Sequence, residues 1–107
     1  MTQLHVLVVY VPVDHVSVVL SALGDAGAGR IGDYSHCAFT SLGTGHFTPL
    51  AGAQPFIGEV GVAEQVPEVR VESVVSADVL DGVVLALRAA HPYEEPAFMT
   101  WPVQGWR

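Results

Sequence analysis

The sequence has no lysine and few charges of any kind. Its 107 residues include four arginines against eleven acidic residues, which gives a formal net charge of −7. Such a chain repels a phosphate backbone and an anionic membrane surface, so we expect no general nucleic-acid binding and no membrane association. Only 14% of the residues are charged and half are hydrophobic. This composition predicts a well-buried globule and favours some surface being hidden in an oligomer.

Cysteine is represented by Cys37 alone, so no internal disulfide can form. A single cysteine is typical of a protein from a reducing cytoplasm. The N-terminus lacks the basic region, apolar stretch and cleavage site of a signal peptide. The apolar run over residues 6–13 is too short to cross a bilayer. We therefore expect a cytoplasmic protein in which residues 1–107 form a single domain.

Several catalytic motifs are also missing, because the sequence contains no GxSxG, HExxH or CxxC. A literal GxGxxG match lies at Gly27, Gly29 and Gly32. In a dinucleotide site such glycines precede a helix, whereas here they follow one, where the helix dipole is negative. We therefore predict a helix C-cap and a tight turn. Arg30, between these glycines, could hold an anion or a carboxylate, or form a structural salt bridge.

What is present is a pattern of strands and amphipathic helices. β-branched and apolar runs predict strands over residues 4–11, 36–41, 68–75 and 98–103, with a long loop over 42–61. Apolar residues at helical spacing predict one helix capped by Asp14 and closed by Gly24 and Gly27, and another capped by Ser76. The two predicted stripes are Val16, Val19, Leu20 and Leu23, and Leu80, Val83, Val84 and Leu87.

The two helical segments form an internal repeat, because residues 14–23 parallel residues 78–87. Two strand–helix–strand copies predict an α+β fold, the ferredoxin-like βαββαβ sandwich. In that fold both helices cover the same face of the sheet. The first strand is apolar on both of its faces, so we expect another copy of the chain to cover the second face. The sequence therefore predicts a homo-oligomer.

The polar residues are concentrated between two prolines, at His91-Pro92-Tyr93-Glu94-Glu95-Pro96-Ala97. Proline fixes φ and removes a backbone donor, so this segment, which we call the HPYEEPA turn, is expected to be stiff. His91, Glu94 and Glu95 have side chains that suit a divalent metal, with His36 and His46 as further candidates. The alternative is a structural helix-to-strand turn whose carboxylates accept backbone N–H bonds or pair with an arginine.

A set of motifs spread along the chain resembles the Nif-three-like (NGG-interacting factor, YqfO-type) family, specifically its inserted domain. The motifs are residues 27–34, Cys37, residues 43–45, Phe47, residues 49–52, Pro55, residues 57–59 and residues 91–97. The resemblance covers nearly the whole chain. It implies a stand-alone inserted domain with a fold similar to that of CutA and the nitrogen-regulatory PII proteins, which are trimers.

The resemblance also bears on function. The metal-binding, hydrolase-like part of the long family members has no counterpart here, so its dimetal ligands cannot be transferred. The resemblance does imply a shared site, with Gly29, Arg30, Gly32, Thr44, Gly45 and Tyr93 as ligand-binding residues and His91, Glu94 and Glu95 as metal ligands.

We therefore expect a non-enzymatic regulatory module that acts as a homotrimer, with its site where the glycine loops and the HPYEEPA turn meet at a subunit interface. Its ligand is left open between a divalent metal ion and a small molecule, and no catalytic residue is assigned. One alternative is a metal-dependent hydrolase with Glu94 or Glu95 as the base and His91 as a ligand. Another is a docking module for a partner protein.

Overall fold

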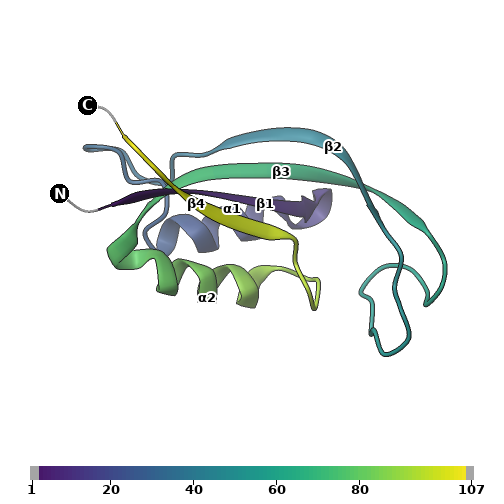
Figure 1. Cartoon of the computed structure of the whole chain (residues 1–107). Coiled ribbons are helices and arrows are strands. Elements are labelled where there is room, and N and C mark those ends of the chain that lie inside the picture. Colours follow the sequence, from purple (N-terminus) through teal and green to yellow (C-terminus); the bar gives the residue numbers. More distant parts are fainter. Residues whose placement is uncertain (1–2, 106–107) are drawn as a thin grey trace.

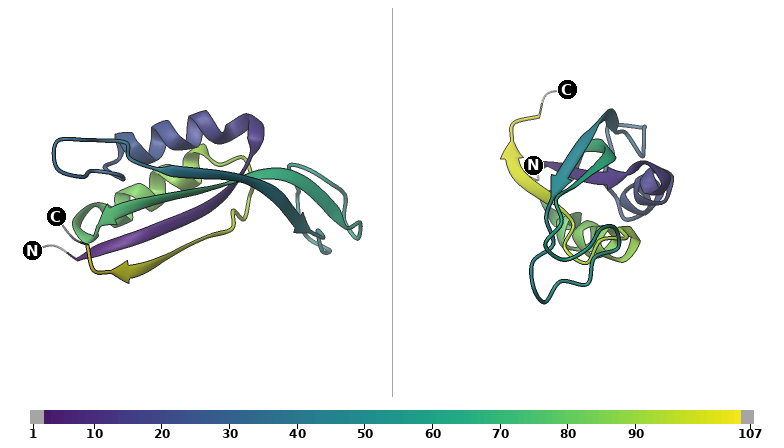
Figure 2. Two further views of the ribbon diagram at one scale, coloured as in Figure 1. Left: turned by 90° about the horizontal axis from the view of Figure 1, so that it is seen from above. Right: turned by 90° about the vertical axis from the view of Figure 1, so that its right-hand side faces the viewer.

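A computed structural model describes residues 3–105 and shows a four-stranded antiparallel sheet with two helices (Figure 1). The strand order is β2-β3-β1-β4, and both helices lie on one face of the sheet (Figure 2). The α+β, ferredoxin-like prediction is confirmed. The elements are β1 Leu4–Pro12, η1 Val13–His15, α1 Val16–Asp25, β2 Phe39–Phe47, β3 Glu64–Ser76, η2 Ala77–Val79, α2 Leu80–Ala90 and β4 Phe98–Val103.

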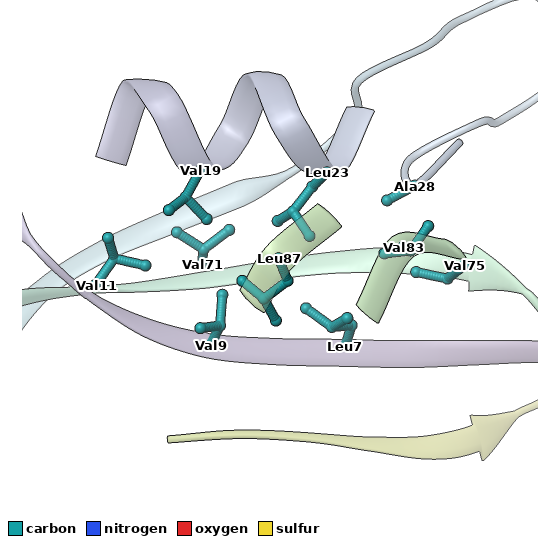
Figure 3. Close-up of a cluster of buried hydrophobic side chains, with 10 residues drawn as sticks. All are labelled: Leu7, Val9, Val11, Val19, Leu23, Ala28, Val71, Val75, Val83 and Leu87. Carbon is teal, nitrogen blue, oxygen red and sulfur yellow. The ribbon is translucent and has the colours of Figure 1, made fainter. Parts of the chain in front are cut away.

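The core lies between the helices and the facing side of β1 and β3 (Figure 3). Val19 and Leu23 of α1 and Val83 and Leu87 of α2 are almost completely buried, as the predicted stripes require. The sheet contributes alternate residues, because successive side chains of a strand point to opposite faces. These are Leu7, Val9 and Val11 of β1 and Val71 and Val75 of β3. Within residues 3–105, neither helix has the length and apolar character needed to cross a membrane.

The two copies of the repeat begin their helices in the same way. Each strand ends in an extended residue, Pro12 (ψ 142°) or Ser76 (ψ 143°), and the chain then makes one 3₁₀ turn before the α-helix. The expected side-chain caps do not form, because neither Asp14 nor Ser76 bonds to a helix N–H group. The 3₁₀ turns themselves supply the first backbone bonds of each helix, so that no side-chain cap is needed.

The second and third strands differ from the sequence-based prediction. β2 begins at Phe39 rather than at residue 36 and continues through Gly43 and Gly45, and β3 begins at Glu64. The predicted 42–61 loop is therefore shortened to residues 48–63. The glycines were interpreted as loop signals, but they pair in register with β3, Gly43 with Glu68 and Gly45 with Val66. β2 is an edge strand, so it tolerates glycines without side chains to pack.

The face of the sheet opposite the helices is not covered by any helix or strand of residues 3–105 (Figure 2). Cross-strand register places Phe39, Glu72, Val8 and Met99 in one row on this face and Val74, Val6 and Trp101 in the next, so the face is mainly apolar. Phe39 is 70% exposed, Met99 46% and Trp101 39%. A large apolar surface of this kind marks an interaction site in a folded protein.

Candidate functional site

The residues expected to share one site lie at opposite ends of the sheet. Gly29, Arg30 and Gly32 lie in the connection after α1, where Gly29 bonds to Val74 of β3. The HPYEEPA turn lies at the other end of the sheet, where Tyr93 contacts Glu68 of β3. Glu68 and Val74 are six positions apart along β3, which is about 20 Å. We call residues 26–38 the glycine-turn end and residues 46–57 together with 91–97 the cavity end.

At the glycine-turn end the glycines serve close backbone packing. The Gly29 N–H donates to Val74 O (2.7 Å), and Gly29 O accepts from the Cys37 N–H (2.9 Å). Gly27, Gly29 and Gly32 have positive φ values of 113°, 78° and 57°, which confirms the predicted turn. A Cβ atom on Gly29 would collide with the Cys37 backbone. These glycines therefore hold the connection against β3.

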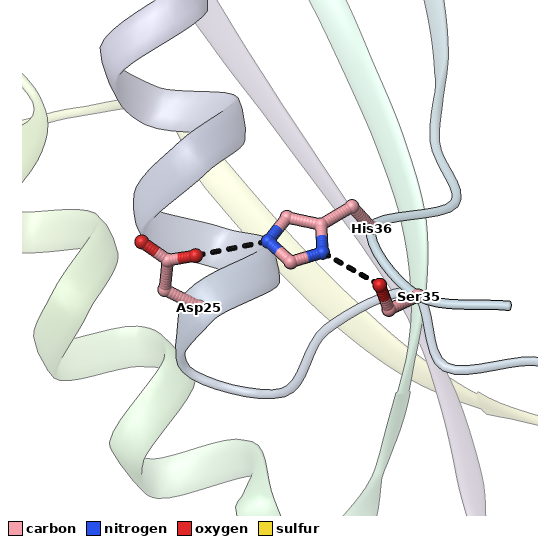
Figure 4. A network of polar contacts seen from close by, with 3 residues as sticks. All are labelled: Asp25, Ser35 and His36. Carbon is pink, nitrogen blue, oxygen red and sulfur yellow. Dashed lines mark hydrogen bonds and ion pairs between the residues drawn. The ribbon is translucent and has the colours of Figure 1, made fainter.

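His36 and Arg30 complete this end of the molecule. The His36 Nε2–H donates to Asp25 Oδ1 (2.9 Å), and Nδ1 shares a hydrogen bond with Ser35 Oγ (2.9 Å; Figure 4). His36 lies outside β2, with φ at 60°, and its ring fills the space beside Gly24. Arg30 is exposed, and its Nε donates to Gly32 O (2.9 Å). Within residues 3–105 Arg30 forms no ion pair, so the salt-bridge alternative is not observed there.

The cavity end encloses about 470 Å³. This volume is within the range of small-molecule sites, roughly 300–1,000 Å³. The wall combines the end of β1, the end of β2 with the loop that follows it, one residue of β3, and the HPYEEPA turn. The lining residues are Tyr10, His46, Phe47, Thr48, Pro49, Leu50, Ala53, Pro55, Phe56, Ile57, Glu68, Tyr93, Glu94, Glu95 and Ala97.

The loop over residues 48–63 keeps its shape through bonds of its own and one bond to the opposite wall. The Gly61 N–H donates to Pro49 O (2.7 Å), which brings the two ends of the loop together. The Gln54 N–H donates to Glu94 Oε1 (2.8 Å), which ties the loop to the HPYEEPA turn. In Figure 1 this loop extends beyond the ends of both helices. The cavity therefore depends on two segments that are 40 residues apart in the chain.

His91 connects three elements at the base of the cavity. Its N–H donates to Leu87 O at the end of α2, its Nε2–H donates to Tyr10 O (2.7 Å), and its Nδ1 accepts from the Tyr93 N–H (3.1 Å). The side chain is buried, and burial lowers the pKa of His91 below 6.5, although the Tyr10 carbonyl and the charge of Glu68 oppose this shift. The negative end of the α2 dipole favours an imidazolium, but burial has the larger effect and the net shift lowers the pKa of His91.

Tyr93 and Glu68 form the most buried polar pair of the cavity. The Tyr93 hydroxyl donates to Glu68 Oε2 (2.9 Å), and Glu68 is only 8% exposed. Burial, followed by this bond and the charge of Glu68, raises the pKa of Tyr93 well above its ordinary range. Tyr93 is therefore a neutral donor to a carboxylate. Gly45 makes room for the pair, because a Cβ atom on it would fall on the Glu68 carboxylate.

Aromatic rings surround this pair. The centroid of Tyr93 lies 5.9 Å from that of Phe47, 6.3 Å from that of Phe56 and 5.0 Å from that of His91. Phe56 in turn meets the edge of His15 at 5.4 Å. These distances are typical of aromatic pairs in protein cores. The loop and the HPYEEPA turn are thus held together by ring packing as well as by the Gln54–Glu94 bond.

The three expected metal ligands lie on one turn but are engaged differently. Both ring nitrogens of His91 are used within the chain, and Glu94 accepts from Gln54, while both glutamates are exposed. Across residues 3–105, no three side chains of histidine, cysteine, aspartate or glutamate are grouped as metal ligands. A metal bound to His91 would have to displace one of its two hydrogen bonds.

Among the other expected residues, Gly45 supports the cavity as described, and Thr44 is exposed and pairs with Pro67 outside the lining. Glu68, Phe56 and Tyr10 were not predicted as site residues from the sequence. Signals in the sequence point to the first two. A glutamate within a valine-rich strand opposite a glycine-containing strand indicates a bulky polar group that needs space. A phenylalanine in a loop rich in glycine and proline indicates an apolar wall.

Comparisons with known proteins place the chain among longer relatives. It is 55% identical over 98 residues to a GTP cyclohydrolase 1 type 2 homolog of Bacillus subtilis and 54% identical over 91 residues to that of Mycobacterium leprae. These matches cover 92% and 85% of this chain but 26% and 24% of the relatives. The chain thus spans about a quarter of the length of the curated relatives it matches. No protein-family model matches the chain.

Solved structures agree with this relationship. A Bacillus cereus protein related to NIF3 superimposes with a TM-score of 0.85 at 45% identity, covering 97% of this chain and 26% of that one. The divalent ion tolerance protein CutA1 of Ehrlichia chaffeensis superimposes with a TM-score of 0.69 at 17% identity, covering 100% of this chain and 87% of that one. The chain therefore has the CutA1 fold and is related to the Nif-three-like family through a segment that forms about a quarter of those longer proteins.

Proposed function

We propose that the chain is a non-enzymatic binding module whose ligand occupies the cavity between the 48–63 loop and the HPYEEPA turn. The observation that carries the proposal is the composition of the wall, where aromatic and proline side chains surround one buried carboxylate. Ligand sites have this character, with mostly apolar walls and a few fixed polar groups. The glycine turn at the other end of the sheet serves the fold within one chain.

Binding, rather than catalysis, fits the state of the polar groups. His91 is neutral, and both of its ring nitrogens are already engaged, so it is poorly placed to accept or deliver a proton. Tyr93 is held protonated by burial and by Glu68. These groups fix the shape of the site, which is the property a recognition module needs. A ligand that strengthens the contact between the 48–63 loop and the HPYEEPA turn would also stabilise the neighbouring elements α2 and β4, which the turn connects.

The module is proposed to act as a homotrimer. The sheet face opposite the helices carries Phe39, Met99 and Trp101, which are large apolar side chains exposed in a single chain. A further copy of the chain is the occupant we propose, and in a trimer this face contacts a different surface of the neighbouring copy, because a patch that pairs with itself closes as a dimer. In such an assembly, a neighbour could also bring its glycine turn to the cavity.

Sedimentation analysis at micromolar concentration tests the assembly. The unmodified chain is expected to sediment as a trimer and Trp101→Glu as a smaller species. Leu85→Glu is the matched control, because Leu85 is 70% exposed on α2, away from the sheet face. An unmodified chain that sediments as a monomer at every concentration contradicts the trimer.

Cavity filling tests the binding site itself. Ala97 lines the cavity and is exposed, so Ala97→Trp is expected to block binding of fragments from a small-molecule library followed by NMR. Ala89→Trp on the exposed side of α2 is the control. If no fragment shifts the signals of Tyr93 and Phe56, or if Ala97→Trp binds as the unmodified chain does, the cavity is not a binding site.

A further inference from the structure

The buried Glu68 carboxylate has one oxygen free for a ligand. Oε2 accepts from the Tyr93 hydroxyl, while Oε1 accepts no hydrogen bond from any residue between 3 and 105. The residue is more than nine-tenths buried and belongs to the cavity wall. The Oε1 atom remains accessible from the cavity, so a ligand there can donate a hydrogen bond to it. A donor that also carries positive charge forms the stronger bond.

The aromatic wall favours the same kind of ligand. Phe47, Phe56 and Tyr93 all line the cavity, and the centroid of Tyr93 lies about 6 Å from that of each phenylalanine. The faces of such rings carry partial negative charge and attract cations within about 6 Å. An organic cation can therefore place its charged group against Glu68 and its apolar body against the rings.

The distribution of charge around the cavity excludes the opposite kind of ligand. Glu94 and Glu95 belong to the wall, and no lysine or arginine does. Of the arginines within residues 3–105, Arg30 is at the glycine-turn end and Arg88 lies over Phe98. Arg70 is the cross-strand partner of the lining residue Tyr10, but it is paired with Glu72 (3.0 Å). A phosphate or carboxylate ligand would therefore meet three glutamates and no arginine among the lining residues.

From these observations we infer that the cavity binds a small organic cation, an ammonium or guanidinium group carried on a planar or apolar body. The inference rests on the proposed binding function and adds the chemical class of the ligand. It separates this cavity from a nucleotide site, because a triphosphate has no cationic partner among its lining residues. The volume of the cavity suits a free small molecule. The alternative source of the cation is a lysine or arginine side chain of a partner protein, and the test distinguishes the two.

The test is calorimetric titration of the full chain at pH 7.5 with three matched probes: 2-phenylethylammonium, 2-phenylethanol and 3-phenylpropanoate. The ammonium probe is expected to bind at least about tenfold more tightly than the alcohol, with no measurable binding of the carboxylate, because only the first can pair with Glu68. GTP serves as a fourth probe and is expected not to bind. An acetylated peptide with a single central lysine distinguishes a side chain of a partner protein from a free cation.

Variants assign the effect to Glu68. Glu68→Gln keeps the shape of the side chain and is expected to weaken the ammonium probe about tenfold while leaving the alcohol unchanged. Glu64→Gln is the matched control, because Glu64 lies on the same strand outside the wall. If Glu68→Gln lowers the melting temperature too far for the titration, Glu95→Gln at the rim replaces it, with a smaller loss expected for the ammonium probe alone.

The outcomes separate the two proposals. If the alcohol or the carboxylate binds as tightly as the ammonium probe and Ala97→Trp blocks all of them, the binding site stands and the inference about its ligand is overturned. If only the lysine peptide binds, the free-cation inference is overturned in favour of a protein partner. If no probe binds, the cation inference is overturned, and the proposed function is then decided separately by the fragment screen with Ala97→Trp and Ala89→Trp.

Discussion

The two ends of the sheet use their polar groups differently. At the glycine-turn end, backbone groups and the His36 ring are hydrogen-bonded to one another, to Asp25 and to β3, and little space is enclosed. At the cavity end, Glu68 keeps one oxygen free while rings and prolines hold a space of about 470 Å³ open. The comparison teaches that glycines at one end allow close backbone packing, while at the other end a polar turn and an apolar loop surround an open space.

The largest effect is expected from Gly29→Val at the glycine-turn end. Gly29 has φ at 78°, and a Cβ atom would collide with the Cys37 backbone, which cannot move without breaking two hydrogen bonds. We expect the free energy of unfolding in urea to fall by at least about 3 kcal/mol. Gly43→Val is the control, because nothing lies within 4 Å of its Cβ position and its φ is not positive. Equal stability of the two variants would show that this end is not structural.

His91→Ala is expected to have the next largest effect. Removing the ring leaves the Tyr10 carbonyl and the Tyr93 N–H without their partners, which costs about 2–3 kcal/mol of unfolding free energy. His46→Ala at the exposed rim should stay within about 0.5 kcal/mol of the unmodified chain. Calorimetric titration with zinc or manganese on the same variants addresses the metal hypothesis. An unchanged stability together with lost metal binding would make His91 a ligand instead of a connector.

Tyr93→Phe isolates the bond between Tyr93 and Glu68. We expect a loss of about 1 kcal/mol of unfolding free energy, because the ring packing remains while the hydroxyl donor is lost. Tyr34→Phe is the control, since Tyr34 is 74% exposed. Combining Tyr93→Phe with Glu68→Gln in a double-mutant cycle measures the interaction directly. A coupling energy near zero would show that the bond adds nothing to stability.

The smallest expected effect is the contribution of His91 to the pH dependence of the free energy of unfolding. Because burial lowers its pKa below 6.5 in the folded chain, the unfolded chain binds more protons in the interval between the two values. The free energy of unfolding should therefore fall as the pH drops below about 6.5 and level off below the folded pKa. The difference between the unmodified chain and His91→Gln should follow this curve, and His46→Gln should not alter it. A difference independent of pH would mean that His91 is not desolvated.

How much of the fold and of the candidate site could be predicted depends on how far apart in the sequence the interacting residues lie. The helix stripes and the bounds of β4 follow from local periodicity. The structure confirms the bounds of β4 and every stripe residue except Val84, which does not pack against the core. The ends of β2 and β3 do not, because Gly43 and Gly45 signal a loop locally and become strand only through pairing with β3. The cavity is even harder to predict from the sequence. Glu68 belongs to the site through its hydrogen bond with Tyr93, 25 residues away, and Gln54 through its hydrogen bond with Glu94, 40 residues away.

The pairing of Leu4 with Val103 on β1 and β4 has a consequence for rearranged versions of the chain. The two strand ends are neighbours in the sheet, so a short linker between them would close the chain at little entropic cost. New ends could then be opened within residues 48–63, which contribute nothing to the buried cluster between the helices and the sheet. Such a circular permutant should fold on the same core while its cavity wall is cut. It would let the core and the cavity be studied separately in one sequence.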